Sequence, residues 1–193
     1  MSLPFEFSPT KLIEDASRRL TSEGSLSILD LGCHIGRNSS FLAGLGHTVI
    51  GITDRLEDAQ AATQFAVTRG VSDKCHFVAA DIRALPLRGM FDVVLMNEVL
   101  HLVTHNQARS VITNAQAMTR TGGLHITSGY VVDPNKANAK NRESMFWPNE
   151  LHKEYKDAGW RILAYQEDPY AEQIFHTRQL VHSKAYVIAQ KEW

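Results

Sequence analysis

LDLGCHIGRNSS, residues 29–40, sets the architecture of this 193-residue chain. An apolar run, residues 26–31, leads into two glycines, Gly32 and Gly36, and a helix-like segment follows without a linker. A glycine-bearing turn between a strand and a helix lets a ligand approach the backbone, and the N-terminus of the helix can receive an anionic group. The stretch therefore predicts a ligand loop at the carboxyl end of a strand in an α/β sheet.

On either side of this loop, strand-like and helix-like segments alternate. The predicted strands are residues 26–31, 48–52, 75–79, 91–97 and 124–130, and the predicted helices are residues 10–23, 38–45, 55–69, 107–118 and 150–158. Such alternation is typical of crossover connections in a parallel sheet with helices on both faces. Two further β-like runs, residues 161–166 and 184–189, are separated by a long loop and predict an antiparallel hairpin at one edge.

The composition is that of a globular protein, with 44% hydrophobic and 21% charged residues. Twenty Lys and Arg against 21 Asp and Glu leave a net charge of −1, which argues against a nucleic-acid partner because binding a phosphate backbone needs clustered cations. We see no targeting segment and no apolar run of the roughly 20 residues that span a membrane. We therefore expect a cytoplasmic monomer or homodimer with a small-molecule substrate and two reduced cysteines.

The spacing of the glycines narrows the choice of ligand. Gly32 and Gly36 read G-x-x-x-G, whereas a dinucleotide site needs G-x-G-x-x-G, and the chain has no G-x-x-x-x-G-K-[ST] phosphate loop. Nicotinamide, flavin and nucleoside triphosphate ligands are thereby disfavoured. What remains is a ligand with an adenosine and a compact charged tail.

The same stretch resembles the first motif of the seven-stranded class of S-adenosylmethionine (SAM)-dependent methyltransferases, and its GRNS ending, residues 36–39, resembles the TehB-type tellurite-resistance methyltransferases in particular. The resemblance continues through residues 78–82, 91–100 and 121–123 and into the tail. It implies an α/β fold: a Rossmann-like three-layer sandwich whose mostly parallel seven-stranded sheet ends in an antiparallel hairpin. It also implies transfer of a methyl group from SAM, with S-adenosylhomocysteine as product, to a small nucleophile such as a thiol or a chalcogen oxyanion.

We expect one domain, residues 1–193, in three parts: an N-terminal helix in residues 1–25, a cofactor-binding core in residues 26–131, and a substrate-side segment with edge strands in residues 132–193. By the resemblance, Asp30 and both glycines surround the methionine part of SAM, Asp81 accepts a hydrogen bond from the adenine amino group, and Asn97 lies against the cofactor. The expected cofactor-binding residues are Asp30, Gly32, His34, Gly36, Arg37, Thr53, Asp54, Asp81, Ile82 and Asn97.

Two positions depart from the family pattern. His34 replaces the middle glycine of the loop, and its Cβ restricts the left-handed conformations that glycine permits. Thr53 replaces the acidic residue that holds the ribose, and Asp54 can take over only if a bulge or turn redirects it. An alternative function is therefore a methyltransferase-like protein with weakened or lost SAM binding.

For catalysis we expect His176, Arg178 and His101, the first two because the family places cationic substrate residues in this part of the tail. His101 and His105 lie four residues apart, but the segment lacks the glutamate and the third ligand of a zinc site, so we expect no metal. His34, His101, His105 and His176 all fall in predicted loops. We expect them to border one pocket that becomes cationic as the pH falls.

Overall fold

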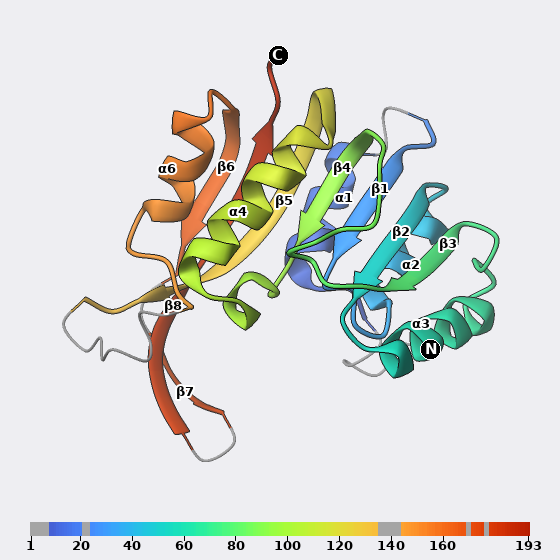
Figure 1. The fold of residues 1–193 in the computed structure, drawn as a ribbon, viewed down its shortest axis with the longest axis horizontal. Helices are drawn as coiled ribbons and strands as arrows, with labels where there is room; N and C mark the ends of the chain where they lie inside the picture. Colours follow the sequence, from blue (N-terminus) through green and yellow to red (C-terminus); the bar gives the residue numbers. More distant parts are fainter. Residues whose placement is uncertain (1–7, 21–23, 135–143, 169–170, 176–177) are drawn as a thin grey trace.

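The computed structural model describes residues 8–20, 24–134, 144–168, 171–175 and 178–193, and between residues 171 and 182 it describes the backbone alone. Figure 1 shows the arrangement of the elements. The helices are α1 (Lys11–Leu20), α2 (Arg37–Gly44), α3 (Leu56–Thr68), the short 3-10 helix η2 (Leu100–Leu102), α4 (His105–Ala117) and α6 (Glu150–Asp157). The strands are β1 (Ser27–Leu31), β2 (Thr48–Thr53), β3 (Cys75–Ala79), β4 (Phe91–Met96), β5 (Thr119–Val132), β6 (Arg161–Glu167), β7 (Ala171–Phe175) and β8 (Arg178–Gln190).

The strands form one sheet in the order β3-β2-β1-β4-β5-β8-β6. The first five are parallel, and β8 runs antiparallel to both of its neighbours. The predicted fold class, with its antiparallel hairpin at the edge, is confirmed. The long loop expected before β8 is wrong in part, because β7 lies there and pairs with the beginning of β8, so that the two strands project away from the sheet (Figure 1).

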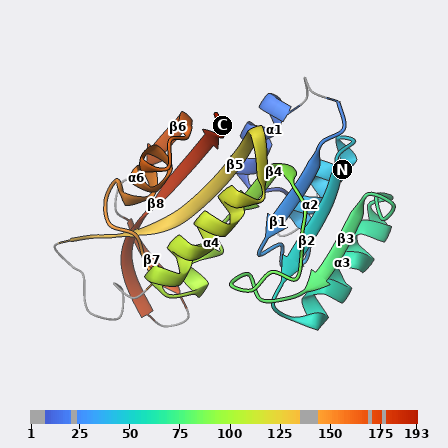
Figure 2. The ribbon, with the colours of Figure 1, turned by 45° about the horizontal axis from the view of Figure 1, so that its top comes forward.

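Helices cover both faces of the sheet (Figure 2). On one face α4 and α6 bury Val111, Leu151 and Tyr155 against the strands. On the other face α1 and α2 do the same, and the spacing of Ile13, Ala16 and Leu20 places them on one side of α1. None of the described helices is both long and apolar enough to cross a bilayer.

The starts of α4 and β5 differ from those predicted. Helix α4 begins at His105 because Thr104 caps it: the Thr104 hydroxyl accepts from the Gln107 backbone N–H, and the Gln107 side chain accepts from the Thr104 N–H. Strand β5 begins at Thr119 rather than at residue 124, because Gly122 and Gly123 are part of the strand. The start of α4 rests on a Thr-x-x-Gln capping box, and the start of β5 on the pairing of Thr119 with Phe91 of β4.

A buried polar network joins β5 to α6 beneath the sheet. The imidazole of His125 lies 2.8 Å from the Thr119 hydroxyl and 3.0 Å from the Tyr155 hydroxyl, which in turn lies 2.7 Å from the Thr127 hydroxyl. All four side chains are fully buried. Burial lowers the pKa of His125 to about 3, so the ring stays neutral and serves as a hydrogen-bonded part of the core.

Candidate active site

The loop between β1 and α2 is a tight turn with left-handed backbone at Gly32 (φ 80°), His34 (φ 49°) and Gly36 (φ 74°). The N–H groups of Gly32 and Cys33 both donate to the carbonyl of Ile52, which ties the loop to β2. His34 therefore adopts the conformation that its Cβ disfavours, because the surrounding hydrogen bonds impose it. The left-handed conformation that the family glycine would permit is thus present at His34.

The two glycines of this loop are required by packing against other strands. A Cβ on Gly32 would lie 2.3 Å from Val99, which follows β4, and one on Gly36 would lie 2.8 Å from the Phe77 ring of β3. Both distances are far below van der Waals contact. The loop is therefore pressed onto the carboxyl ends of β3 and β4.

Asp30, at the end of β1, is 2% exposed and accepts a hydrogen bond of 2.6 Å from the Ser39 hydroxyl in the first turns of α2. Burial raises the pKa of its carboxyl to about 6, although the Ser39 hydrogen bond and the charge of Arg37 act in the opposite direction. The buried carboxylate joins β1 to α2 directly beneath the loop.

The turn after β4 carries Asn97 and Glu98. Ser128 of β5 holds both residues: its hydroxyl donates to the Asn97 side-chain oxygen over 3.0 Å and accepts from the Glu98 backbone N–H over 2.8 Å. Glu98 has a left-handed backbone, with φ 54°. Strain of this kind at a strand end is typical of functional sites.

The residues expected at the adenosine end lie at the carboxyl ends of β2 and β3. Thr53 is buried and in regular register with Ala79, and the exposed Asp54 follows it in a bend. Asp81 is exposed, and the Arg83 guanidinium donates hydrogen bonds to both of its carboxylate oxygens, with Nε 2.9 Å from each. This hydrogen bonding holds the pKa of Asp81 below its usual range.

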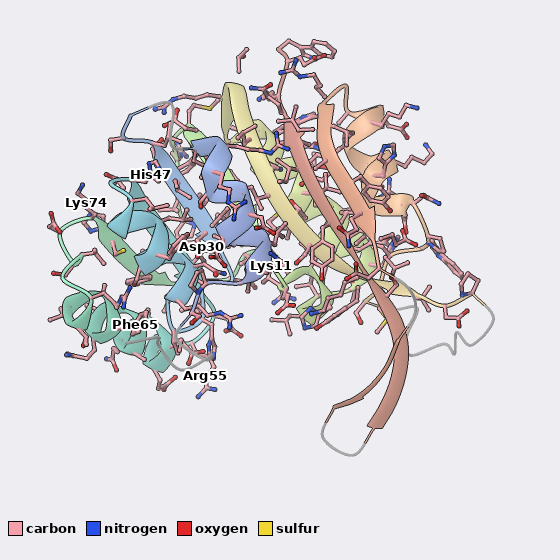
Figure 3. All side chains as sticks on the ribbon, turned by 180° about the vertical axis from the view of Figure 1, so that it is seen from behind. Lys11, Asp30, His47, Arg55, Phe65 and Lys74 are labelled. Atoms are coloured by element: carbon pink, nitrogen blue, oxygen red, sulfur yellow. The ribbon has the colours of Figure 1, made fainter. Side chains whose placement is uncertain are left out.

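A cavity of about 760 Å³ opens beside this loop, on the face of the sheet that carries α1. In Figure 3, which shows that face, α1 lies between α2 and β8 and Lys11 marks its first residue. Arg37 and Asn97 border the cavity, so two expected cofactor residues meet there. Its other lining residues come from α1 and the two residues before it, from the turn after β4, and from β6, β8 and the residue after β6: Pro9, Thr10, Lys11, Leu12, Asp15, Arg19, Glu98, Ala164, Tyr165, Gln166, Asp168, Lys184, Tyr186 and Ile188.

The prediction that the loop histidines share one pocket is wrong for the three that are described. His34 is exposed and lies 4.0 Å from Asp58 of α3, and His105 lies 2.9 Å from Glu150 of α6. The His101 ring instead packs on Tyr130, with 4.6 Å between the ring centroids. Each histidine contacts a residue that is distant in the chain, so the position of the histidines in predicted loops could not show that they lie in different surroundings.

Two expected catalytic residues cannot be placed. His176 lies outside the described residues, and Arg178 begins β8 but its side chain is not described. Among the side chains that are described, no three His, Cys, Asp or Glu residues are grouped as metal ligands.

The cavity is lined by Lys184 and Tyr186, which sequence reasoning missed. Their signal was a lysine and a tyrosine two positions apart in a strand, which places both on one face.

The sheet order and the loop after β1 define a class of protein, and comparison with known proteins agrees. Residues 28–123 match a family model described as a methyltransferase domain. The crystal structure of TehB from Haemophilus influenzae superposes with a TM-score of 0.76 at 22% identity, covering 93% of this chain and 61% of that one. Magnesium protoporphyrin IX methyltransferase from Synechocystis, solved with bound SAM, gives a TM-score of 0.64 at 18% identity over 90% of this chain and 77% of its own. Residues 28–123 thus form a methyltransferase domain, and the chain as a whole has the fold of the class I SAM-dependent methyltransferases.

Within that class the chain resembles TehB. The TehB methyltransferase of Haemophilus influenzae is 28% identical over 144 residues, which are 73% of this chain and 48% of that protein. The ubiquinone biosynthesis O-methyltransferase of Colwellia psychrerythraea is 36% identical over 99 residues, which are 51% of this chain and 39% of that protein. The chain thus spans about half or less of the length of these two relatives.

Proposed function

We propose that this chain transfers the methyl group of SAM to a small-molecule nucleophile, a thiol or an oxyanion of tellurium or selenium. The observation that carries the proposal is the position of the cavity. It borders Arg37 after β1 and Asn97 after β4, and between these two strands the order of the sheet reverses. Open α/β sheets bind their ligands at this reversal, outside the carboxyl ends of the strands.

The charged end of SAM matches the side chains at this position. The Arg37 guanidinium can pair with the methionine carboxylate, and the Asp30 carboxylate is the buried acceptor nearest the loop for an ammonium group. When bound, SAM supplies a methyl group on a sulfonium cation that is already activated. The residues of the chain have to align the acceptor, keep water away and manage the charge of the acceptor.

At the adenosine end, the proposal assigns Asp81 to the adenine amino group, with Ile82 packed nearby and Thr53 or Asp54 at the ribose. A carboxylate oxygen can accept more than one hydrogen bond, so Asp81 can bind an amino group while it keeps Arg83. Because the ion pair is half exposed, sharing it costs little. The left-handed His34 supports this assignment over the alternative of lost SAM binding, since the loop keeps its shape.

The relatives do not identify the methyl acceptor of this chain, because their names refer to different reactions. TehB, a ubiquinone biosynthesis O-methyltransferase and a sterol 4-C-methyltransferase all match the chain. We assign His176, Arg178 and His101 to the acceptor side, on the resemblance of the tail and on the position of His101 beside Tyr130. The balanced charge supports a small-molecule partner, and we infer a cytoplasmic monomer or homodimer.

Calorimetric titration of the whole chain with SAM, and separately with S-adenosylhomocysteine, tests the proposal. We expect saturable heat from both ligands, and Asp81→Ala should weaken binding roughly threefold to tenfold, the value of one hydrogen bond. Asp73→Ala, which removes an exposed carboxylate before β3, is the matched control and should bind like the parent chain. Absence of heat and of thermal stabilisation at millimolar SAM would show that the proposal is wrong.

A further inference from the structure

An ion pair lies in the wall of the cavity, next to the turn after β4. The Lys184 ammonium donates a hydrogen bond to the Glu98 carboxylate, and Lys184 Nζ lies 5.4 Å from the centroid of the Tyr130 ring. Lys184 of β8 is the register partner of Tyr130 in β5. The side chains of Lys184 and Glu98 are 23% and 34% exposed, so the pair is partly screened from water but open to the cavity.

The backbone holds Glu98 in this position. Its left-handed φ of 54° is a conformation that a residue with a Cβ rarely adopts unless its surroundings hold it there. The Ser128 hydroxyl holds it by accepting a hydrogen bond from the Glu98 backbone N–H. Asn97, the residue before it, is held by the same hydroxyl. The strained turn therefore fixes a carboxylate beside a residue expected to contact SAM.

Protonated groups surround the pair. Tyr186 lines the same cavity, and burial raises its pKa to about 12, with the nearby Asp168 and Glu98 carboxylates adding to the effect. Burial also raises the pKa of Tyr130. At neutral pH both phenols keep their protons, so they do not act as bases here. Other charged side chains also line the cavity (Lys11, Asp15, Arg19, Arg37 and Asp168), but Glu98 and Lys184 are the two that contact each other at the turn after β4. At this turn Glu98 can receive a proton and Lys184 can face an anion.

We propose that Glu98 and Lys184 form the acceptor site and that the acceptor is a weakly acidic thiol or phenol that enters neutral. The S–H or O–H bond breaks, its proton passes to a Glu98 carboxylate oxygen, and its electron pair stays on the sulfur or oxygen. The resulting anion lies beside the Lys184 ammonium, which no longer faces a charged Glu98. This thiolate or phenolate is the nucleophile that methyl transfer needs, and the inference rests on the proposed methyltransferase function.

The pairing also discriminates between the acceptor classes proposed above. An oxyanion of tellurium or selenium is already charged when it enters and would place a second negative charge beside Glu98 before any proton moves. A neutral thiol avoids this repulsion, because its charge appears only as Glu98 loses its own. The charge of Glu98 therefore favours the thiol.

Chromogenic acids test the site without SAM. Para-nitrothiophenol and para-nitrophenol absorb at longer wavelength when ionised, so titrating the whole chain with each, at a pH below the pKa of the probe, reads ionisation directly. We expect the chain to bind and ionise at least one probe, with its apparent pKa lowered by about one unit, a tenfold shift. A response to the first probe alone assigns a thiol, and a response to the second alone assigns a phenol.

Substitutions then separate the two roles. Glu98→Gln should bind the probe without ionising it, Lys184→Met should lose the ionisation and weaken binding, and Lys184→Arg should restore both. Glu154→Gln is the matched control, because Glu154 also forms an ion pair, with Arg109 between α4 and α6, and it should behave like the parent chain. Circular dichroism verifies folding, and if Glu98→Gln does not fold, the Met and Arg variants at position 184 still decide.

The inference is wrong if the parent chain binds neither probe at millimolar concentration, if a bound probe stays neutral, or if Glu98→Gln ionises it as the parent chain does. The SAM titration separates this failure from that of the proposed function. A chain that binds SAM but ionises no probe refutes the acceptor site alone. A chain that gives no heat with SAM refutes the methyltransferase activity, whatever the probes show.

Discussion

Replacing the buried carboxylate under the loop, Asp30→Asn, should make the protein more stable at neutral pH. Burial raises the pKa of Asp30 from 3.8 to about 6. The folded state therefore binds this proton more tightly than the unfolded state, and stability is lost as the pH rises from about 4 to about 6. At 1.36 kcal/mol per pKa unit, a difference of roughly two units costs the ionised protein about 3 kcal/mol.

Asparagine removes that cost and can keep the contact with the Ser39 hydroxyl, so we expect Asp30→Asn to raise the free energy of unfolding by about 2–3 kcal/mol at pH 8. The gain should vanish below pH 4, where the wild-type carboxyl is protonated in both states. Urea unfolding followed by circular dichroism at a series of pH values measures it. SAM binding should weaken in the same variant, since the loop loses its buried charge.

Asp92→Asn is the matched control, with the opposite sign. Asp92 accepts hydrogen bonds from Ser27 and Arg120, which hold its pKa below its usual range although burial opposes them. Its contribution to stability is present above the unfolded-state pKa and is lost as the pH falls through the folded-state pKa, so Asp92→Asn should destabilise at pH 8. If Asp30→Asn were the less stable protein at pH 8, or if its effect did not shrink in acid, the electrostatic reasoning would be refuted.

Three further outcomes are expected. Gly32→Ala should lower the free energy of unfolding by about 2–4 kcal/mol, because the added Cβ would overlap Val99 at a left-handed φ. Chemical denaturation measures the loss, and a change under about 1 kcal/mol would contradict the packing described for the loop. Tyr155→Phe should lower the free energy of unfolding by about 1–3 kcal/mol, because the buried side chains of His125 and Thr127 lose the hydroxyl that both of them contact. Thermal and urea unfolding test this, and an unchanged midpoint would count against it. Arg178→Ala should raise the KM for the acceptor and leave the calorimetric Kd for SAM unchanged, whereas equal loss of both would contradict the assigned role.

Much of the fold is readable from local patterns. The expected strand of residues 75–79 coincides with β3, and β1, β2 and β4 lie within one residue of expectation at each end. The nearly continuous apolar runs of β1 and β4 indicate strands directly, because these two strands lie inside the sheet and are buried on both faces. Strand β7 carried no such pattern, since its pairing with β8 depends on the partner strand.

The cofactor roles of Asp30 and Arg37 stay predictions, but their placement at one edge of the sheet follows from local pattern, because a strand, a turn and a helix follow one another there. The residues of the cavity wall could not be predicted in this way. Lys184 meets Glu98 only because β8 inserts between β5 and β6, and His105 pairs with Glu150 only because α4 and α6 pack on the same face.

In this protein, the chain alone specifies which segments form strands and helices, and where the glycine loop interrupts them, since periodicity and backbone freedom act over a few neighbouring residues. The tertiary structure decides which charges face one another. Glu98 and Lys184 are 86 positions apart in the chain, and the pairing of β5 with β8 brings them together. Long-range strand order is set by the packing of the whole sheet, so the proposed acceptor site can form only in the folded molecule.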